Sequence, residues 1–131
     1  MMAEAADVST PLILVVDDDW MNREMMQAYL TRAGFRVDVA HDAETALRKA
    51  SEFLPSLVML DVRMGEKDGF EVCQELKANP RTQAISVVML SALSTEESRR
   101  RAVEVGAVGF LTKTMHLASM VDQVRQFVEL S

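Results

Sequence analysis

Short runs of hydrophobic residues recur five times along the 131-residue chain. The first, over residues 12–16, reads LILVV and has no polar residue at alternate positions. A run of this kind is typical of a strand buried on both faces of a parallel sheet, because both sets of alternating side chains must then be apolar. Similar runs predict four further strands over residues 35–40, 57–60, 85–90 and 108–111.

Between these runs, apolar residues recur at helical spacing, and the stretches begin and end at residues typical of helix caps. They predict helices over residues 20–33, 42–53, 68–78, 94–105 and 117–130. Asp68 precedes Glu71, and Ser94 precedes Glu97, by the three positions of a capping box, so Asp68 and Ser94 are the expected N-caps. Gly34 is the expected stop of the first helix.

Strand and helix therefore alternate five times, which predicts an α/β fold with a parallel sheet between two layers of helices. We expect one domain over residues 11–131, preceded by a flexible N-terminal arm of small and polar residues over 1–10. In folds of this class, ligands bind beyond the carboxyl ends of the strands. Functional residues are therefore expected where the strands end.

Polar residues follow four of the five predicted strands. They are Asp17, Asp18 and Asp19 after the first strand, Asp61 after the third, Ser91 after the fourth and Lys113 after the fifth. Neighbouring carboxylates repel each other, so a cluster of them needs a compensating cation. Carboxylate oxygens suit a hard divalent ion such as Mg²⁺, and Lys113 supplies a second positive charge that can pair with Asp61.

This set of side chains suits the transfer of a phosphoryl group onto a carboxylate. Asp61 can act as the nucleophile and form an aspartyl phosphate, while a metal ion and Lys113 neutralise charge. The hydroxyl of Ser91 can donate a hydrogen bond to a phosphoryl oxygen. When that hydroxyl is drawn inward, the side chain of Phe110 can fill the space it leaves, so a local change of charge would favour one of two conformations.

Four segments at these strand ends resemble the receiver domains of two-component response regulators. They are ILVVDDD over residues 13–19, LDVRM over 60–64 followed by Asp68-Gly69, VMLSA over 88–92 and GFLTK over 109–113. Each motif alone is weakly specific, but the four occur in the right order, and each lies at the end of its predicted strand. The resemblance extends over residues 12–130.

The resemblance implies a three-layer α/β/α fold whose five-stranded parallel sheet has the flavodoxin-like order 2-1-3-4-5. It implies that Asp61 is the phosphoacceptor and that Lys113 is the lysine common to the family. Asp17 and Asp18 match the family's acidic pair. Asp18 and Asp61 would then bind Mg²⁺ together with the backbone carbonyl of Arg63.

The same resemblance implies a switch, a donor and an output surface. Ser91 matches the switch hydroxyl and Phe110 the switch aromatic residue. The phosphoryl donor would be a phosphohistidine on a sensor histidine kinase or a phosphotransfer protein. Output would use the fourth helix, the fifth strand and the fifth helix, a surface that would also serve for a homodimer.

Three positions depart from the family pattern. Gly65 and Thr114 stand where the family usually has proline, so the loop at Gly65 is expected to be more mobile. The Lys113–Thr114 bond is expected to be either trans with a shifted loop or a strained cis bond, since a cis bond before a residue other than proline costs about 2.5–4 kcal/mol. Arg63, two residues after Asp61, is expected near the phosphoryl group.

Composition and charge exclude several other classes. The formal net charge is −6, which argues against direct binding to nucleic acid or to an anionic membrane. No apolar run approaches the roughly 18 residues of a membrane span, and the amino terminus does not read as a secretory signal. A single cysteine, Cys73, excludes a disulfide within the chain, so a cytoplasmic protein is expected.

Several of these residues also have simpler interpretations. One alternative is that residues 17–19 form only a helix N-cap with two solvated neighbours, and Asp19 is the expected cap in either case. Trp20 either packs at the start of the helix or shields the metal site. Cys73 is expected to be a small buried residue rather than a redox centre.

Two further sets of residues have structural interpretations. The ten methionines, including Met21, Met25 and Met26, are expected to pack in the interior rather than to form a binding surface. The arginines over residues 99–101 are expected on the solvated face of the fourth helix, with a charged partner or dimer surface as the alternative.

Two other functions compete with a phosphorylation switch. A phosphohydrolase with an aspartyl-phosphate intermediate, similar to haloacid-dehalogenase enzymes, would typically carry a second acid two residues after the nucleophile, where this chain has Arg63. A degenerate receiver would act only as a protein-interaction scaffold, and the intact set of acids, serine and lysine argues against it. We therefore expect no turnover enzyme, but a module that catalyses only its own phosphorylation and dephosphorylation.

Overall fold

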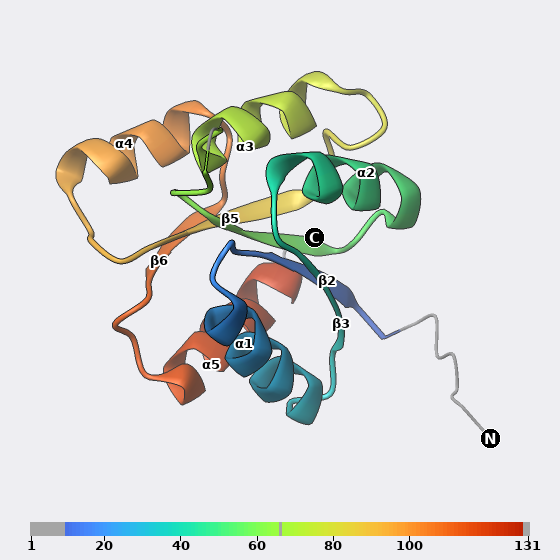
Figure 1. The fold of residues 1–131 in the computed structure, drawn as a ribbon, viewed down its shortest axis with the longest axis vertical. Helices are drawn as coiled ribbons and strands as arrows, with labels where there is room; N and C mark the ends of the chain where they lie inside the picture. The colour runs from blue at the N-terminus through green and yellow to red at the C-terminus, as the bar shows by residue number, and fades with distance from the viewer. Residues whose placement is uncertain (1–9, 66, 130–131) are drawn as a thin grey trace.

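The computed structural model describes residues 10–65 and 67–129, in which strands and helices alternate along the chain (Figure 1). The elements are β2 (Leu12–Val16), α1 (Trp20–Arg32), β3 (Arg36–Ala40), α2 (Ala43–Phe53), β4 (Leu57–Asp61), α3 (Gly69–Ala78), β5 (Ser86–Ser91), α4 (Glu96–Glu104), β6 (Gly109–Thr112) and α5 (Leu117–Glu129). Each predicted element is present, with its ends within two residues of the expectation. Most of the predicted arm (residues 1–9) and the predicted helical residue Leu130 lie outside the described residues. No described helix has both the length and the apolar character needed to cross a membrane.

The five described strands are all parallel and lie in the order β3-β2-β4-β5-β6. Numbered along the chain this order is 2-1-3-4-5, so the predicted flavodoxin-like α/β class is confirmed. β2 pairs with β3 on one side and with the central strand β4 on the other. The strand order reverses at β2 and β4, and ligands bind at such a switch point in folds of this class.

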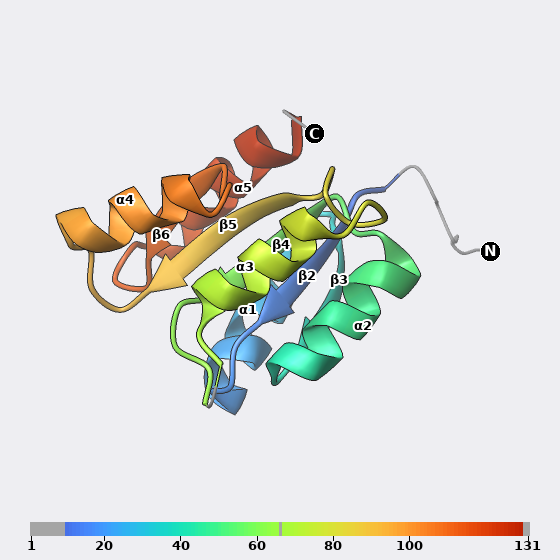
Figure 2. The ribbon, with the colours of Figure 1, turned by 90° about the horizontal axis from the view of Figure 1, so that it is seen from above.

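Helices cover both faces of this sheet. α1 and α5 pack together on one face, and α2, α3 and α4 lie over the other, with α3 in the middle (Figures 1 and 2). Alternate side chains of β2 pack against the two helix layers. Ile13 and Val15 belong to the core beneath α1 and α5, whereas Leu14 and Val16 belong to the core beneath α2, α3 and α4. This double burial is the reason why the strand reads as an unbroken apolar run.

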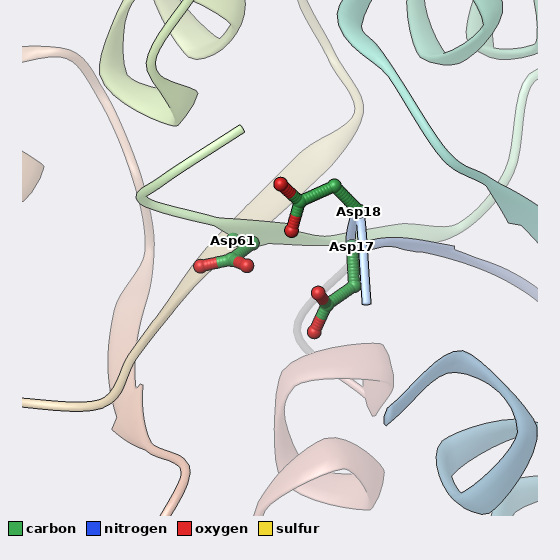
Figure 3. A group of neighbouring side chains, drawn as sticks. All are labelled: Asp17, Asp18 and Asp61. Carbon is green, nitrogen blue, oxygen red and sulfur yellow. The ribbon is translucent and has the colours of Figure 1, made fainter. Parts of the chain in front are cut away.

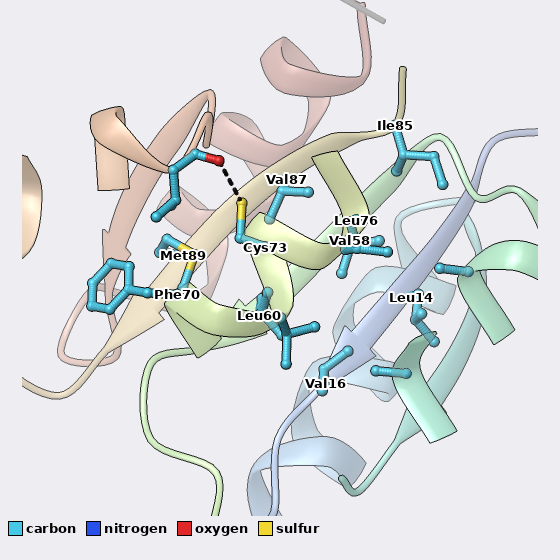
Figure 4. Close-up of a cluster of buried hydrophobic side chains, with 14 of the residues drawn as sticks. Leu14, Val16, Val58, Leu60, Phe70, Cys73, Leu76, Ile85, Val87 and Met89 are labelled. Carbon is cyan, nitrogen blue, oxygen red and sulfur yellow. Dashed lines mark hydrogen bonds between the residues drawn. The ribbon is translucent and has the colours of Figure 1, made fainter. Parts of the chain in front are cut away.

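The core beneath α2, α3 and α4 contains the cysteine (Figure 4). Cys73 lies with Phe70 of α3 over Leu60 and Met89 of the sheet. Its thiol is fully buried and donates a hydrogen bond to the backbone carbonyl of Val105, with Sγ 3.4 Å from the oxygen. Burial raises the pKa of the thiol to about 11, so it stays protonated at neutral pH. The interpretation of Cys73 as a small buried residue is confirmed.

The helix starts agree with the predicted caps at α3 but not at α4. Asp68 and Glu71 form the expected capping box. At α4 the N-cap is Thr95, whose hydroxyl accepts a backbone N–H of the first turn at 3.0 Å, so the prediction of Ser94 was wrong. The Ser94 hydroxyl instead accepts a hydrogen bond from Nε of Arg99 at 2.6 Å, and the helix begins after Thr95.

α1 presents a different face to the sheet from the one its methionines suggested. Met26 and Leu30 are buried, as expected for Met26. Met21 and Met25 are exposed, together with Tyr29, so the expectation that these two methionines pack in the interior was wrong. The helix carries apolar residues on two adjacent stripes, and only the stripe that contains Met26 and Leu30 faces the sheet.

Candidate functional site

The carboxyl ends of β2 and β4 bring two acidic side chains together. Asp17 directly follows β2 and is 1% exposed, and Asp61 is the last residue of β4 and is 5% exposed. The register pairs Val16 with Leu60, so the acids that follow them stand side by side. Asp18 is exposed and turns its carboxylate towards Asp61 (Figure 3). The predicted convergence of acids at this edge of the sheet is confirmed.

Lys113 joins the two buried carboxylates. Its Nζ lies 2.9 Å from Oδ2 of Asp61 and 3.0 Å from Oδ2 of Asp17. Its backbone N–H donates a hydrogen bond to the carbonyl of Ser91 at 2.8 Å. This bond extends the pairing of β5 with β6 and fixes the position of the Lys113 backbone. The predicted pairing of Lys113 with Asp61 is confirmed, and the structure adds Asp17 to it.

Backbone N–H groups hold the other oxygens of these carboxylates. Asp19 donates its N–H to Oδ1 of Asp17 at 2.9 Å. Arg63 donates its N–H to Oδ1 of Asp61 at 3.1 Å. Each carboxylate therefore has one oxygen on the loop that follows it and the other on Lys113, so its orientation is set before a ligand binds.

Burial and charge perturb the pKa values of the two central groups. Burial raises the pKa of the Asp61 carboxyl to about 6; the hydrogen bond from Lys113 offsets part of this rise, and the negative charge of Asp17 adds to it. Burial alone would lower the pKa of Lys113, but its hydrogen bonds to Asp61 and Asp17 outweigh that effect and raise the pKa. At neutral pH the site therefore contains a mostly ionised Asp61 facing an ammonium group.

The acids also have the composition of a divalent-cation site. One carboxylate oxygen each from Asp17, Asp18 and Asp61 lies within 4.8 Å of the others. Lys113 pairs with Asp17 and Asp61 and carries a single positive charge, so the three carboxylates are not fully compensated. Mg²⁺ prefers hard oxygen ligands and keeps several waters, so a carboxylate cluster with one exposed member fits it.

The neighbouring residues Asp19 and Trp20 lie outside this cluster. Oδ1 of Asp19 accepts the N–H of Met21 at 2.9 Å, which confirms Asp19 as the N-cap of α1. Because Asp17 is bound to Lys113, the alternative of an N-cap with two solvated neighbours is wrong. Trp20 is 63% exposed and does not pack in the interior.

The two predicted switch residues lie on neighbouring strands. Ser91 is the last residue of β5, and its Oγ accepts a hydrogen bond from the N–H of Leu93 at 3.2 Å. Phe110, in β6, is partly buried against the core beneath α2, α3 and α4. The guanidinium of Arg99 lies over the Phe110 ring, 5.0 Å from its centroid. The Ser91 hydroxyl is thus engaged by the turn after β5, and the Phe110 ring by α4.

Residues 13–125 match the profile of the response regulator receiver domain. The chain belongs to this family. The receiver domain is 42% identical to the response regulator PleD of Caulobacter vibrioides over 113 residues, which cover 86% of the chain and 25% of PleD. It is 36% identical to the DNA-binding transcriptional regulator RpaA of Synechocystis over 115 residues, which cover 88% of the chain and 48% of RpaA. The structure of the chemotaxis protein CheY4 of Vibrio cholerae matches with a TM-score of 0.86 at 26% identity, over 90% of this chain and 98% of that one.

The receiver domain spans about a quarter of PleD and about half of RpaA, so it corresponds to one part of each. Receiver domains are the phosphorylation switches of two-component response regulators, which is the general function that family membership assigns to this chain. The CheY4 match extends the likeness to the arrangement of the whole fold.

Two residues support the site of this receiver domain although the sequence had given them no role. Gly69 begins α3 directly beside Asp61, and a Cβ at this position would collide with the carbonyl oxygen of Asp61. Arg23 of α1 donates from Nη1 to the backbone carbonyl of Asp17 at 2.8 Å. The only sign of the role of Gly69 in the sequence is a weak one, its position directly after the predicted N-cap Asp68. Arg23 gives no such signal, because its contact depends on the orientation of α1.

The loops that depart from the family pattern have their own geometry. No peptide bond among the described residues is cis, so the Lys113–Thr114 bond is trans and the alternative of a strained cis bond is wrong. Gly65 has a φ of +58°, which glycine adopts readily and proline cannot. The loop after Asp61 therefore follows a path that the usual proline would not allow. The side chain of Arg63 in this loop is exposed.

Proposed function

We propose that this receiver domain accepts a phosphoryl group on Asp61 and signals through the resulting change of conformation. The observation that carries the proposal is the environment of the Asp61 carboxylate. It is almost fully buried, one oxygen is bound to Lys113 and the other to a backbone N–H, and two further acids lie beside it. A carboxylate held in this way can act as a nucleophile whose direction of attack is fixed.

In the proposed reaction, a carboxylate oxygen of Asp61 forms a bond to phosphorus while the bond from phosphorus to the donor nitrogen breaks. The electron pair of that bond leaves with the donor, a phosphohistidine on a sensor histidine kinase or a phosphotransfer protein. Lys113, which pairs with Oδ2 of Asp61 before transfer, then pairs with a phosphoryl oxygen as a point charge. Transfers of this kind depend mainly on alignment and charge neutralisation.

We also propose Mg²⁺ as the cofactor. Asp18 and Asp61 would hold it directly, with Asp17 and the backbone carbonyl of Arg63 completing the site. When bound, the ion supplies positive charge for the oxygens of the transferring phosphoryl group. The chain contributes a ligand on the open side, Asp18, and keeps Asp17 in place through Lys113.

The proposed switch begins at Ser91. Its hydroxyl would leave the Leu93 N–H and donate to a phosphoryl oxygen, and Phe110 would move into the space that opens. Because Phe110 lies in β6 beside α4, we propose the surface of α4, β6 and α5 as the output face and as the surface of a homodimer. The single cysteine is in keeping with the cytoplasm as the place of action.

The two competing functions are less well supported. A phosphohydrolase needs an acid to activate water near the phosphoryl group, and the residue two positions after Asp61 is Arg63, whose side chain is exposed. A scaffold needs no ordered acidic site, whereas here Asp17 and Asp61 are buried and fixed by Lys113. Burial of two like charges side by side is costly and is only partly offset by Lys113, so a binding or catalytic role explains the arrangement better than a scaffold does.

Incubation with acetyl phosphate and Mg²⁺, followed by measurement of the intact mass, tests the proposal. We expect the mass to rise by one phosphoryl group per chain and to remain unchanged when a chelator removes the metal. An unchanged mass in the presence of Mg²⁺ would support the scaffold and reject the switch. Rapid release of inorganic phosphate over many turnovers would support the phosphohydrolase instead.

The adjacent acids Asp18 and Asp19 provide a matched pair of variants. Asp18→Asn is expected to raise the Mg²⁺ concentration needed for half-maximal uptake by at least about 10-fold, because a charged ligand is lost and even a hydrogen-bond partner of a ligand contributes about 10–100-fold to metal affinity. Asp19→Asn is expected to behave like the wild type, since asparagine caps a helix as well as aspartate does. Equal effects of both changes would show that the charge of this segment matters and that Asp18 is no ligand.

A further inference from the structure

Two arginines of α4 stack on aromatic side chains from different neighbours of the helix. The guanidinium of Arg99 lies over the ring of Phe110 in β6, 5.0 Å from its centroid. The guanidinium of Arg101 lies over the ring of Phe70 in α3 at 4.6 Å and pairs with Asp68 at 3.5 Å. Both distances to the ring centroids are within the range at which a cation is attracted to an aromatic face.

These contacts are important for α4 because the helix itself buries little apolar surface. Within Glu96–Glu104, only Ala102 is buried. The helix lies over the edge of the sheet with α3 beside it (Figure 2). Arg101 ties α4 to the N-cap of α3, and Arg99 ties it to β6. The contacts of Arg99 and Arg101 therefore add to the small apolar surface that holds α4 against its neighbours.

Arg99 also connects the two proposed switch residues. Its Nε donates to Oγ of Ser94 at 2.6 Å, and Ser94 lies in the turn between β5 and α4. In the same turn, the N–H of Leu93 donates to Oγ of Ser91 at 3.2 Å. The turn between β5 and α4 thus contacts Ser91 through Leu93, and α4 contacts Phe110 through Arg99. The hydrogen bond between Arg99 and Ser94 connects the two.

We propose that Arg99 is a latch that holds Phe110 in its partly exposed position and so favours the unphosphorylated conformation. The inference rests on the proposed function, in which Ser91 moves to the phosphoryl group and Phe110 follows it inward. That movement takes the ring away from the guanidinium. Withdrawal of Ser91 from Leu93 also changes the turn that carries Ser94, the hydrogen-bond partner of Arg99. An interaction made in only one of two conformations shifts the equilibrium towards that conformation.

Arg99→Gln and Arg100→Gln form a matched pair, because each removes one positive charge from an exposed position on α4. Beryllium trifluoride mimics a phosphoryl group and binds reversibly, so its affinity reports the equilibrium between the two conformations. We expect Arg99→Gln to tighten its binding by about two- to fivefold, the effect of losing one exposed cation–π contact from the competing state. Arg100→Gln is expected to bind like the wild type. In a Phe110→Leu background, which lacks the ring, the effect of Arg99→Gln should vanish.

A second measurement separates the latch from the proposed function. The NMR signal of the Ser91 amide in the unphosphorylated protein reports the turn, which connects to Arg99 through Ser94. We expect Arg99→Gln to displace this signal and Arg100→Gln to leave it in place. If the Ser91 signal had the same position in both variants, the proposed latch would be overturned, whether or not the protein takes up phosphate. The two proposals can fail separately. If the wild type took up no phosphoryl group, but Arg99→Gln alone displaced the Ser91 signal, the proposed function would be rejected and the connection between Arg99 and the turn after Ser91 would stand.

Discussion

Replacement of Lys113 by methionine is expected to slow phosphoryl uptake from acetyl phosphate by about 10²–10³-fold, the usual loss when one preorganised charge-stabilising group is removed from a site. Methionine retains an unbranched chain of similar length but has no charge. Lys113 pairs with Asp61 and Asp17 at 2.9 and 3.0 Å, so its loss leaves two buried carboxylates facing each other. A phosphoryl group, itself anionic, would then approach a more negative site. The measurement is the rate of phosphoryl uptake at saturating Mg²⁺.

Lys67→Met is the matched control, because it removes the same charge from a residue that pairs with Glu75 outside the acidic cluster. We expect its rate to stay close to that of the wild type, since an exposed ion pair contributes little. A similar slowing in both variants would show that overall charge, and not the position of Lys113 between Asp17 and Asp61, sets the rate.

Gly69→Ala is expected to lower the free energy of unfolding by about 1–3 kcal/mol, the typical cost of overpacking. The added Cβ would collide with the backbone carbonyl oxygen of Asp61, which cannot turn aside as a side chain can. Either α3 or the end of β4 must therefore shift. Because Asp61 is the last residue of β4, we also expect slower phosphoryl uptake in this variant. Denaturant unfolding and the uptake rate measure the two effects.

Gly106→Ala is the control for a loss of stability without a loss of function. Gly106 has a φ of +93°, so alanine there is also destabilising, but it precedes β6, at the end of the sheet opposite to the acidic cluster, and its neighbour is the side chain of Lys77. We expect this variant to unfold more easily and to take up phosphate at the wild-type rate. If Gly69→Ala did likewise, the packing of α3 against Asp61 would have no part in positioning the phosphoacceptor.

The site could be predicted largely because of where its residues stand in the chain. Asp17, Asp61 and Lys113 each follow a short apolar run, and parallel strands place their carboxyl ends on one edge of a sheet. Once alternation of strand and helix is established, proximity of these side chains follows from topology. The sequence does not reveal that Lys113 pairs with Asp17 as well, because that depends on the lengths and angles of three side chains.

The wrong predictions, of the N-cap of α4 and of the buried face of α1, arose where two neighbouring residues or stripes were almost equally suitable. Ser94 and Thr95 both carry a hydroxyl just before α4, and the contact of Ser94 with Arg99 decides between them. In α1, two adjacent stripes are apolar, and only packing against the sheet shows that Met26 is buried and Met25 is not. Such choices depend on tertiary contacts and not on periodicity.

Contacts that depend on how a helix packs against its neighbours could not be predicted from the sequence. Gly69 lies against Asp61 and Arg99 stacks on Phe110 because α3 and α4 pack closely on the strands that precede and follow them. An exposed arginine on a polar helix face gives no sign of its aromatic partner. The latch proposed for Arg99 therefore depends on the three-dimensional arrangement alone.

The most direct test of the central claim is to locate the phosphoryl group on the chain. Borohydride reduces an aspartyl phosphate to homoserine, with release of phosphate, and mass spectrometry of peptides identifies the converted position. After phosphorylation with acetyl phosphate and Mg²⁺, we predict homoserine at position 61 alone, and no conversion in Asp61→Asn. Conversion at Asp17 or Asp18 in the wild type, or unchanged phosphoryl uptake by Asp61→Asn, would contradict the assignment of Asp61 as the phosphoacceptor.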